Sequence, residues 1–188
     1  MKRPPGPDRP RPGASLPALG RGFGLFVLLM AQAVPAHSST EAQLKAAFLV
    51  NFFKYVEWPQ APAEYRLCLF GRTELWPYLA PYEGRQVAGK PLHVQRINGA
   101  EEAAHCHQVF LPASEATSTS AVLGEVARAP VLTVGENDAF LVAGGGIALA
   151  PSSGQLQFDI NARALKQARL KAGSPMLRLA RSVRGQER

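Results

Sequence analysis

The sequence predicts a single-domain α/β protein, a Rossmann-like sandwich with a mostly parallel sheet, a C-terminal antiparallel hairpin and helices on both faces. Three observations predict this class. Short apolar runs typical of buried strands alternate with helical segments between residues 41 and 134, which is the pattern of βαβ units. Two alternating strands at 147–150 and 155–160 flank PSSG, which indicates a four-residue hairpin loop. A length of 188 residues without an internal repeat or a long linker fits one domain.

Residues 1–38 have the layout of a secretory signal peptide. Five Lys and Arg residues precede the apolar run at 23–34, and small residues follow it. We expect cleavage between Ala36 and Glu41 and a mature domain of residues 39–188 in the periplasm. That domain keeps 16 basic and 13 acidic residues, so its net charge is +3 instead of +7. A charge this small gives no reason to expect a nucleic-acid partner.

Residues 41–59 predict a long helix that the rest of the domain should enclose. Thr40 and Gln43 have the spacing of a capping box, and Pro59 ends the helix. Apolar side chains cover more than half of its circumference. Lys45 falls near the middle of this apolar arc. Either its ammonium group reaches water past the helix end, or it is buried against a carboxylate or a ligand.

The remaining elements follow from apolar runs and capping residues. We expect buried strands at 65–71, 108–111 and 131–134, an alternating strand at 91–97, and short helices at 73–79, 100–104 and about 122–128. Asn161 is expected to cap the helix after the hairpin, and Ser174 a last helix with Pro175 at its first position. The polar face of that last helix holds three arginines that either are solvated or contact an acidic partner, namely Arg178, Arg181 and Arg184.

Cys68 and Cys106 are the only cysteines. In an oxidising compartment two cysteines favour a disulfide, and the strands they belong to can be neighbours in a βαβαβ arrangement. Two buried free thiols are the alternative. The histidines on either side of Cys106 cannot close a tetrahedral zinc site without further ligands.

The sequence contains no complete catalytic or cofactor motif. Residues 84–90 spell G-x-x-x-x-G-K, but Pro91 follows where a phosphate-binding loop needs Ser or Thr. There is no G-x-S-x-G nucleophile motif. Glu136, Asp138 and Asp159 could converge as catalytic carboxylates, although their spacing favours ordinary turn and strand roles. We therefore expect no enzyme activity, no cofactor and no metal.

A binding site is expected where parallel strands end. Ligands of open α/β sheets bind beyond the carboxyl ends of the strands, here residues 71–73, 112–114 and 135–138. Arg72 is a candidate to hold a small anion there, or is simply a surface arginine. Phe140, beside a triglycine in the connection 136–147, either contacts a partner or fills the edge of the core. Asp138, Asp159 and Asn161 are further candidate contacts.

The stretch KAAFLVNFFKYVEWP, which begins at Lys45, resembles the opening signature of the YfiR-like periplasmic proteins. Asn51, Phe52, Tyr55, Trp58 and Pro59 occupy its typical positions. Four later motifs, at 67–71, 131–135, 144–147 and 157–161, occur in the family's order. The resemblance spans about residues 41 to 183.

The resemblance implies an exported, non-enzymatic regulator. It would bind the periplasmic part of an inner-membrane diguanylate cyclase, repress cyclic-di-GMP production, and be released by an envelope or redox signal, often through an outer-membrane lipoprotein. A homodimer is a further option. Cys68 and Cys106 match the first two of the four cysteines of some members, and the later pair is missing, so redox control through that pair is not expected. The alternative function is a periplasmic solute-binding or accessory module of a sensor kinase or an outer-membrane receptor.

Overall fold

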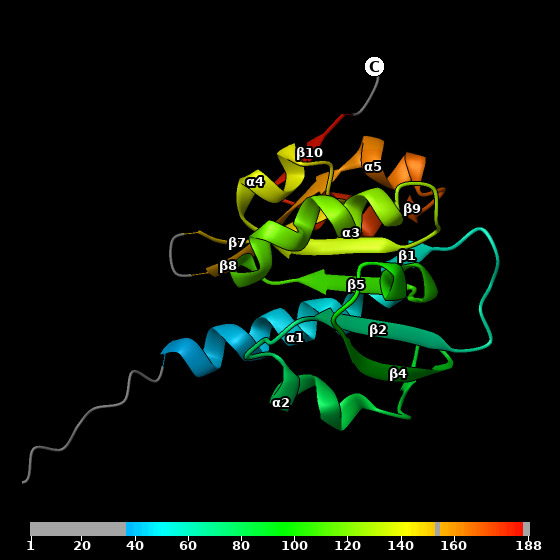
Figure 1. Ribbon diagram of the computed structural model, residues 1–188, viewed down its shortest axis with the longest axis vertical. Helices are drawn as coiled ribbons and strands as arrows, with labels where there is room; N and C mark the ends of the chain where they lie inside the picture. Colours follow the sequence, from blue (N-terminus) through cyan, green and yellow to red (C-terminus); the bar gives the residue numbers. More distant parts are fainter. Residues whose placement is uncertain (1–36, 153–154, 186–188) are drawn as a thin grey trace, which may run out of the picture. The chain divides into compact units, whose positions relative to one another are not determined.

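The computed structural model of the protein describes residues 37–152 and 155–185 (Figure 1). The expected signal peptide lies outside these residues, except for its last two, which belong to the first helix. No helix in the described ranges combines the length and apolar character needed to cross a membrane.

An eight-stranded sheet forms the centre of the fold, in the order β10-β8-β7-β6-β5-β2-β4-β3. Neighbouring strands run parallel except for the pairs β3–β4 and β7–β8. The strands of this sheet are β2 (Tyr65–Phe70), β3 (Gln86–Val87), β4 (Lys90–Ile97), β5 (Gln108–Leu111), β6 (Leu132–Glu136), β7 (Ile147–Ser152), β8 (Gln155–Asn161) and β10 (Ser182–Arg184).

Helices cover both faces of this sheet. Successive side chains of a strand point to opposite sides, so the apolar side chains of a buried strand need cover on each face. Leu67 and Leu69 of β2 join the core beneath α1, whereas Cys68 and Phe70 join the core beneath α3. In Figure 1, α3 crosses in front of the sheet and α1 passes behind it. The core beneath α1 contains residues of four helices, α1 (His37–Tyr55), α2 (Trp76–Leu79), α5 (Ala162–Gln167) and α6 (Ser174–Leu179). The core beneath α3 contains residues of η2 (Glu101–His105), α3 (Thr119–Glu125) and α4 (Asn137–Val142). The predicted fold class is confirmed.

The first helix differs from the expectation at both ends. It begins at His37, so Thr40 lies inside it and is not its N-cap. It ends at Tyr55, because β1 (Val56–Glu57) leaves the helix to pair antiparallel with β9 (Lys171–Ala172). Most of its apolar arc is buried, although Leu44 remains 45% exposed.

The C-terminal part contains three elements that the sequence did not predict, namely α4, the two-residue strand β9 and β10. Residues 137–142 form α4 where a connection was expected. The last helix was expected to carry Arg181 and Arg184, but α6 ends at Leu179 and residues 182–184 form β10, parallel to β8. Ser174 is the first residue of α6 and Gly173 its N-cap, so the expected cap is wrong by one position. The cap of α5 is confirmed, since Asn161 accepts a hydrogen bond from the Ala164 N–H at 3.1 Å.

The expected hairpin is present but tighter than PSSG suggested. Strands β7 and β8 pair antiparallel as far as Ser152 opposite Gln155. Residues 153 and 154, which follow Ser152 in the sequence, lie outside the described ranges.

A disulfide joins Cys68 of β2 to Cys106, two residues before β5. Both cysteines are buried, at 0% and 5% exposure. The pairing is possible because β2 and β5 are neighbours, with Cys68 opposite Val109. The predicted disulfide is confirmed, and neither cysteine is a free thiol.

Candidate functional site

The strand order creates a topological switch point between β2 and β5. From β2 the chain crosses to β4 on one side, and then returns to β5 on the other side. Loops beyond the carboxyl ends of two such strands diverge and leave a crevice. A pocket of about 260 Å³ opens there, lined by Arg72, Thr73, Glu74, Leu75, Pro112, Ser114 and Glu136. We refer to this pocket as the carboxyl-edge crevice, and it brings together all three strand ends that the sequence predicted.

Glu136 lines this crevice and is paired with Lys45, a buried lysine of α1. The Lys45 Nζ lies 2.6 Å from Glu136 Oε1, 2.9 Å from Glu41 and 3.9 Å from Glu74. The other oxygen of Glu136 accepts the Ala113 N–H at 2.7 Å. Lys45 is 8% exposed, so it is the buried, carboxylate-paired lysine of the two interpretations.

The charge of Lys45 is held in place by these partners. Burial by itself lowers the pKa of the ammonium group, but the hydrogen bonds and charges of Glu136 and Glu41 outweigh burial, and the pKa is raised. Glu41 lies one helical turn before Lys45, a spacing visible in the sequence. Glu136 is 91 residues away, and no local signal connected it with the lysine.

Arg72 is an exposed cation at the mouth of the crevice. Within the described ranges, no acidic group lies within 4 Å of its guanidinium. Glu74 is also exposed on the same wall. The role of Arg72 as an anion contact stays a prediction.

Asp159 and Asp138 belong to a separate charge network at the C-terminus. Asp159 is fully buried and accepts two hydrogen bonds from the Arg181 guanidinium and one from Ser182 Oγ at 2.8 Å. The Arg181 hydrogen bonds in particular hold the pKa of Asp159 below its ordinary value, against the effect of burial. Asp138 lies 3.1 Å from Arg184 and 3.7 Å from Arg181.

This network corrects two expectations. Arg181 and Arg184 are neither purely solvated nor free for an acidic partner, because they neutralise carboxylates of the same domain. The three carboxylates 136, 138 and 159 do not form one group, since Glu136 pairs with Lys45 and the other two pair with arginines. Asp159 and Arg181 instead attach β10 to β8.

Phe140 is a core residue. Its side chain is 5% exposed and packs in the core beneath α3. The ring lies directly over the backbone of two glycines. A Cβ atom added at Gly135 would lie 2.5 Å from the nearest ring atom, and one added at Gly145 would lie 2.1 Å from it. Its expected contact with a partner is therefore wrong, and the alternative, a plug at the edge of the core, is correct. Val142 is the apolar residue of α4 that faces solvent, at 81% exposure.

The signature residues at the end of α1 are mainly packing residues. Trp58 stacks on Phe53 with ring centroids 5.6 Å apart, and its indole N–H donates to the His107 carbonyl at 3.3 Å. Phe52 meets Phe158, from the 157–161 motif, edge to face at 5.4 Å. Tyr55 keeps 38% exposure, Asn51 is half-buried and Pro59 is exposed. Two of the family-like motifs are thus joined across the core.

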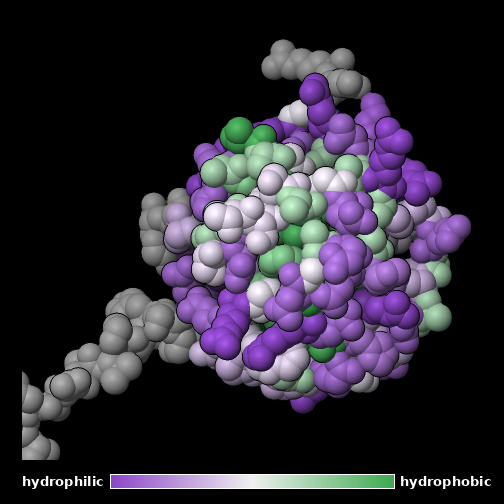
Figure 2. All heavy atoms as spheres, viewed as in Figure 1, coloured by the Kyte–Doolittle hydropathy of each residue, from purple (hydrophilic) through white to green (hydrophobic). Residues whose placement is uncertain are grey.

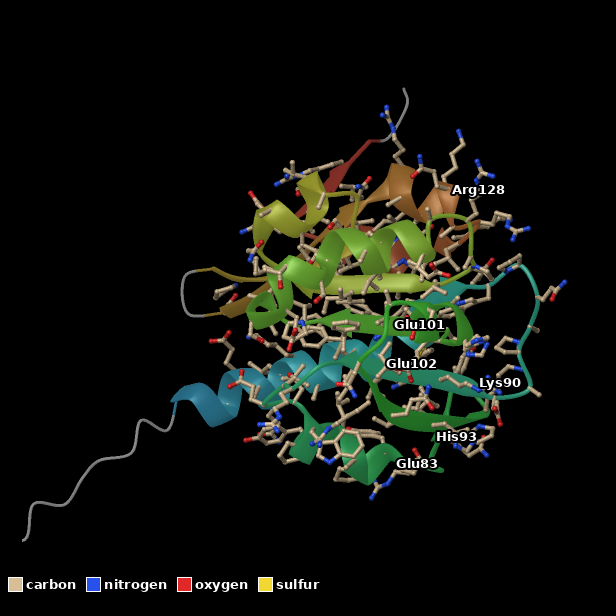
Figure 3. All side chains as sticks on the ribbon, in the orientation of Figure 1. Glu83, Lys90, His93, Glu101, Glu102 and Arg128 are labelled. Atoms are coloured by element: carbon tan, nitrogen blue, oxygen red, sulfur yellow. A yellow bond between two sulfur atoms is a disulfide. The ribbon has the colours of Figure 1, made fainter. Side chains whose placement is uncertain are left out.

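His93 lies in an exposed group with two glutamates. His93 lies between Glu83 at 2.8 Å and Glu64 at 3.2 Å, near the start of β4, where Figure 3 labels it beside Glu83 and Lys90. This group is exposed and contains no nucleophile. No group of three His, Cys, Asp or Glu side chains in the described ranges is arranged to hold a metal ion.

A shallow hollow of about 360 Å³ lies on the α3 side of the sheet. Small residues such as Gly124, Ala127, Ala143 and Gly144 line it. In Figure 2, apolar and weakly polar side chains gather over α3 and α4, and strongly hydrophilic ones surround them. None of the described residues that line this hollow is charged.

These features define a doubly wound α/β domain with one buried disulfide and a charged crevice at its switch point. The chain belongs to the YfiR/HmsC-like family, whose sequence profile matches residues 42–181. Members of this family are periplasmic regulators in cyclic-di-GMP signalling and not enzymes, and the disulfide fits such an oxidising compartment.

Two solved structures have a similar fold. A conserved domain protein from Vibrio cholerae O1 biovar El Tor matches with a TM-score of 0.54 and 10% identity over 76% of this chain. An ABC domain from Streptococcus pneumoniae in complex with L-Trp matches with a TM-score of 0.52 and 11% identity over 73% of this chain. This chain covers 60% of each of those proteins. At such identities the likeness concerns the fold alone.

Proposed function

We propose that this domain binds the periplasmic part of an inner-membrane diguanylate cyclase and holds the cyclase inactive, which lowers cyclic-di-GMP production. The observation that carries the proposal is the family match over residues 42–181, which takes in the signature helix, the crevice and most of the C-terminal segment. An outer-membrane lipoprotein that competes for the domain would release the cyclase.

Exposed apolar side chains on the outer side of α1 are suited to contact with a protein partner. Leu44 and Tyr55 are large, apolar and exposed at 45% and 38%, and they are three helical turns apart on one side of the helix. Phe48 lies between them and is half-buried against Phe158. Because the domain carries a net charge of only +3, apolar contact should contribute more to affinity than long-range attraction.

A pull-down from solubilised membranes with residues 39–188 tests the proposal, together with the cyclic-di-GMP level of cells with and without the gene. We expect the wild-type domain to retain a membrane diguanylate cyclase, and deletion to raise cyclic-di-GMP. Leu44→Asp should abolish retention, whereas Gln43→Asp, at an exposed position beside it, should not. An unchanged cyclic-di-GMP level on deletion, with no cyclase retained, would contradict the proposal.

The exposed Arg72 in the carboxyl-edge crevice favours a second candidate function, that of a solute-binding or accessory module of a sensor kinase or outer-membrane receptor. A thermal-shift screen of small anionic solutes tests it. A stabilising solute whose effect disappears in Arg72→Ala would support this function. Light scattering on the same samples measures whether the domain forms the homodimer that the resemblance allows.

A further inference from the structure

A groove between α5, β9 and α6 has an apolar floor and a positively charged rim. We name it the α5–α6 groove. Its volume is about 380 Å³, and Leu165, Leu170 and Leu177 contribute to the floor, whereas Lys166, Arg169 and Lys171 stand at the rim. None of its lining residues is acidic. The groove is separate from the carboxyl-edge crevice, with which it shares no lining residue.

Arg169 occupies a backbone position that favours glycine. The Leu170 N–H donates to the Leu165 carbonyl at 2.8 Å, and the Arg169 N–H donates to the Lys166 carbonyl at 3.0 Å. These two bonds form the Schellman motif that ends α5, with Arg169 at its left-handed residue (φ +59°). A residue with a side chain at this position makes the folded protein less stable than glycine would. Glycine would therefore make the fold more stable at position 169, yet the chain has an arginine there.

Two of the rim cations, Arg169 and Lys171, have no acidic partner among the described residues. Arg169 and Lys171 are exposed, and no ion pair within 4 Å joins either of them to a residue in the described ranges. Glu57 stands opposite Lys171 in the β1–β9 pair without reaching it. An anionic group placed at this rim would meet both of these cations.

We propose that the α5–α6 groove binds a single-chain anionic amphiphile such as a fatty acid. Its hydrocarbon chain lies over the leucines, and its carboxylate binds Arg169 and Lys171. An apolar cleft with a few convergent charged groups is the usual form of a small-ligand site, and the volume lies within the usual range. A guanidinium can bind a carboxylate through two parallel hydrogen bonds. The proposal does not depend on the cyclase partner.

Titration of residues 39–188 with monomeric dodecanoate tests the proposal by calorimetry. We expect saturable binding of one molecule, and much weaker binding of the uncharged dodecan-1-ol. Arg169→Gly should raise the melting temperature of the free protein by about 2–4 °C, because it relieves the left-handed arginine, and should weaken dodecanoate binding roughly tenfold. A loss of affinity in a more stable protein cannot result from misfolding.

Two variants complete the test. Leu177→Asp places a negative charge in the floor and should abolish binding, whereas Arg178→Ala removes an exposed arginine of the same helix outside the groove lining and should leave affinity unchanged. The proposal is overturned if dodecanoate does not bind, or if Arg169→Gly binds it as tightly as the wild type. It is equally overturned if only anionic lipid vesicles or a hexaglutamate peptide bind. A stable dimer that Leu177→Asp dissociates would give the groove to a second copy of the chain.

Discussion

Removal of the Lys45 ammonium group should destabilise the domain strongly, although the lysine lies in the first turns of a long helix. Lys45 is held by Glu136 at 2.6 Å and Glu41 at 2.9 Å, and its side chain is 11% exposed. Lys45→Met keeps an unbranched apolar side chain, one atom shorter, but leaves the Glu136 carboxylate without its cation. The helix α1 then loses its charged contact with the end of β6.

The magnitude follows from the burial of the partners. Removing one member of a fully buried pair costs about 3–5 kcal/mol. The Glu136 side chain keeps 20% exposure and its hydrogen bond from Ala113, so we expect a loss of about 2–3 kcal/mol and a fall in melting temperature of about 5–10 °C. Urea unfolding followed by circular dichroism, with the disulfide intact, measures the first quantity.

Lys54→Met is the matched control, since Lys54 is an exposed lysine of the same helix. It should change stability by less than about 0.5 kcal/mol. The double variant Lys45→Met with Glu136→Gln should be more stable than the sum of the single losses predicts, because the uncompensated carboxylate is then absent. A Lys45→Met loss no larger than that of Lys54→Met would refute the argument.

Three further predictions concern the core, the disulfide and the C-terminal network. Phe140→Ala should lower the free energy of unfolding by about 3–5 kcal/mol, because it empties the space over two glycines. Partner capture by the folded fraction of this variant should not change. A loss of capture at unchanged stability would speak against a purely structural role of Phe140. Replacement of Cys68 and Cys106 together by Ala should cost about 4 kcal/mol, for a bridge whose sequence separation is 38, measured by urea unfolding; a loss below about 1 kcal/mol would count against it. Because Arg181 holds the pKa of Asp159 below its ordinary 3.8, the ionised carboxylate stabilises the fold above that pH, and this contribution disappears as the pH falls below it. Asp159→Asn should therefore cost roughly 3 kcal/mol at pH 7, and its difference from wild type should shrink in acid unfolding below pH 3.8; a constant difference would contradict the assignment.

The sequence by itself determined the features that depend on local patterns. Strand and helix periodicity placed β2, β4, β5, β6 and the hairpin β7–β8 within a few residues, because each is a run of apolar or alternating side chains long enough to show its period. Asn161 was recognised as a cap because capping needs only the residue and its next turn. The disulfide could be anticipated from two cysteines on strands that the chain order brings together.

The tertiary structure decided what depends on distant segments. Residues 182–184 were expected to continue the last helix, but they form β10 beside β8, where Arg181 and Ser182 bind the buried Asp159. The partner of Lys45 is 91 residues away, so only the folding of α1 against the end of β6 could choose between a solvated and a buried lysine. The α5–α6 groove likewise combines residues of α5, β9 and α6, which only the folded chain brings together. Local sequence sets which segments are helix or strand, whereas contacts between distant segments set which charges are buried and which remain free to bind.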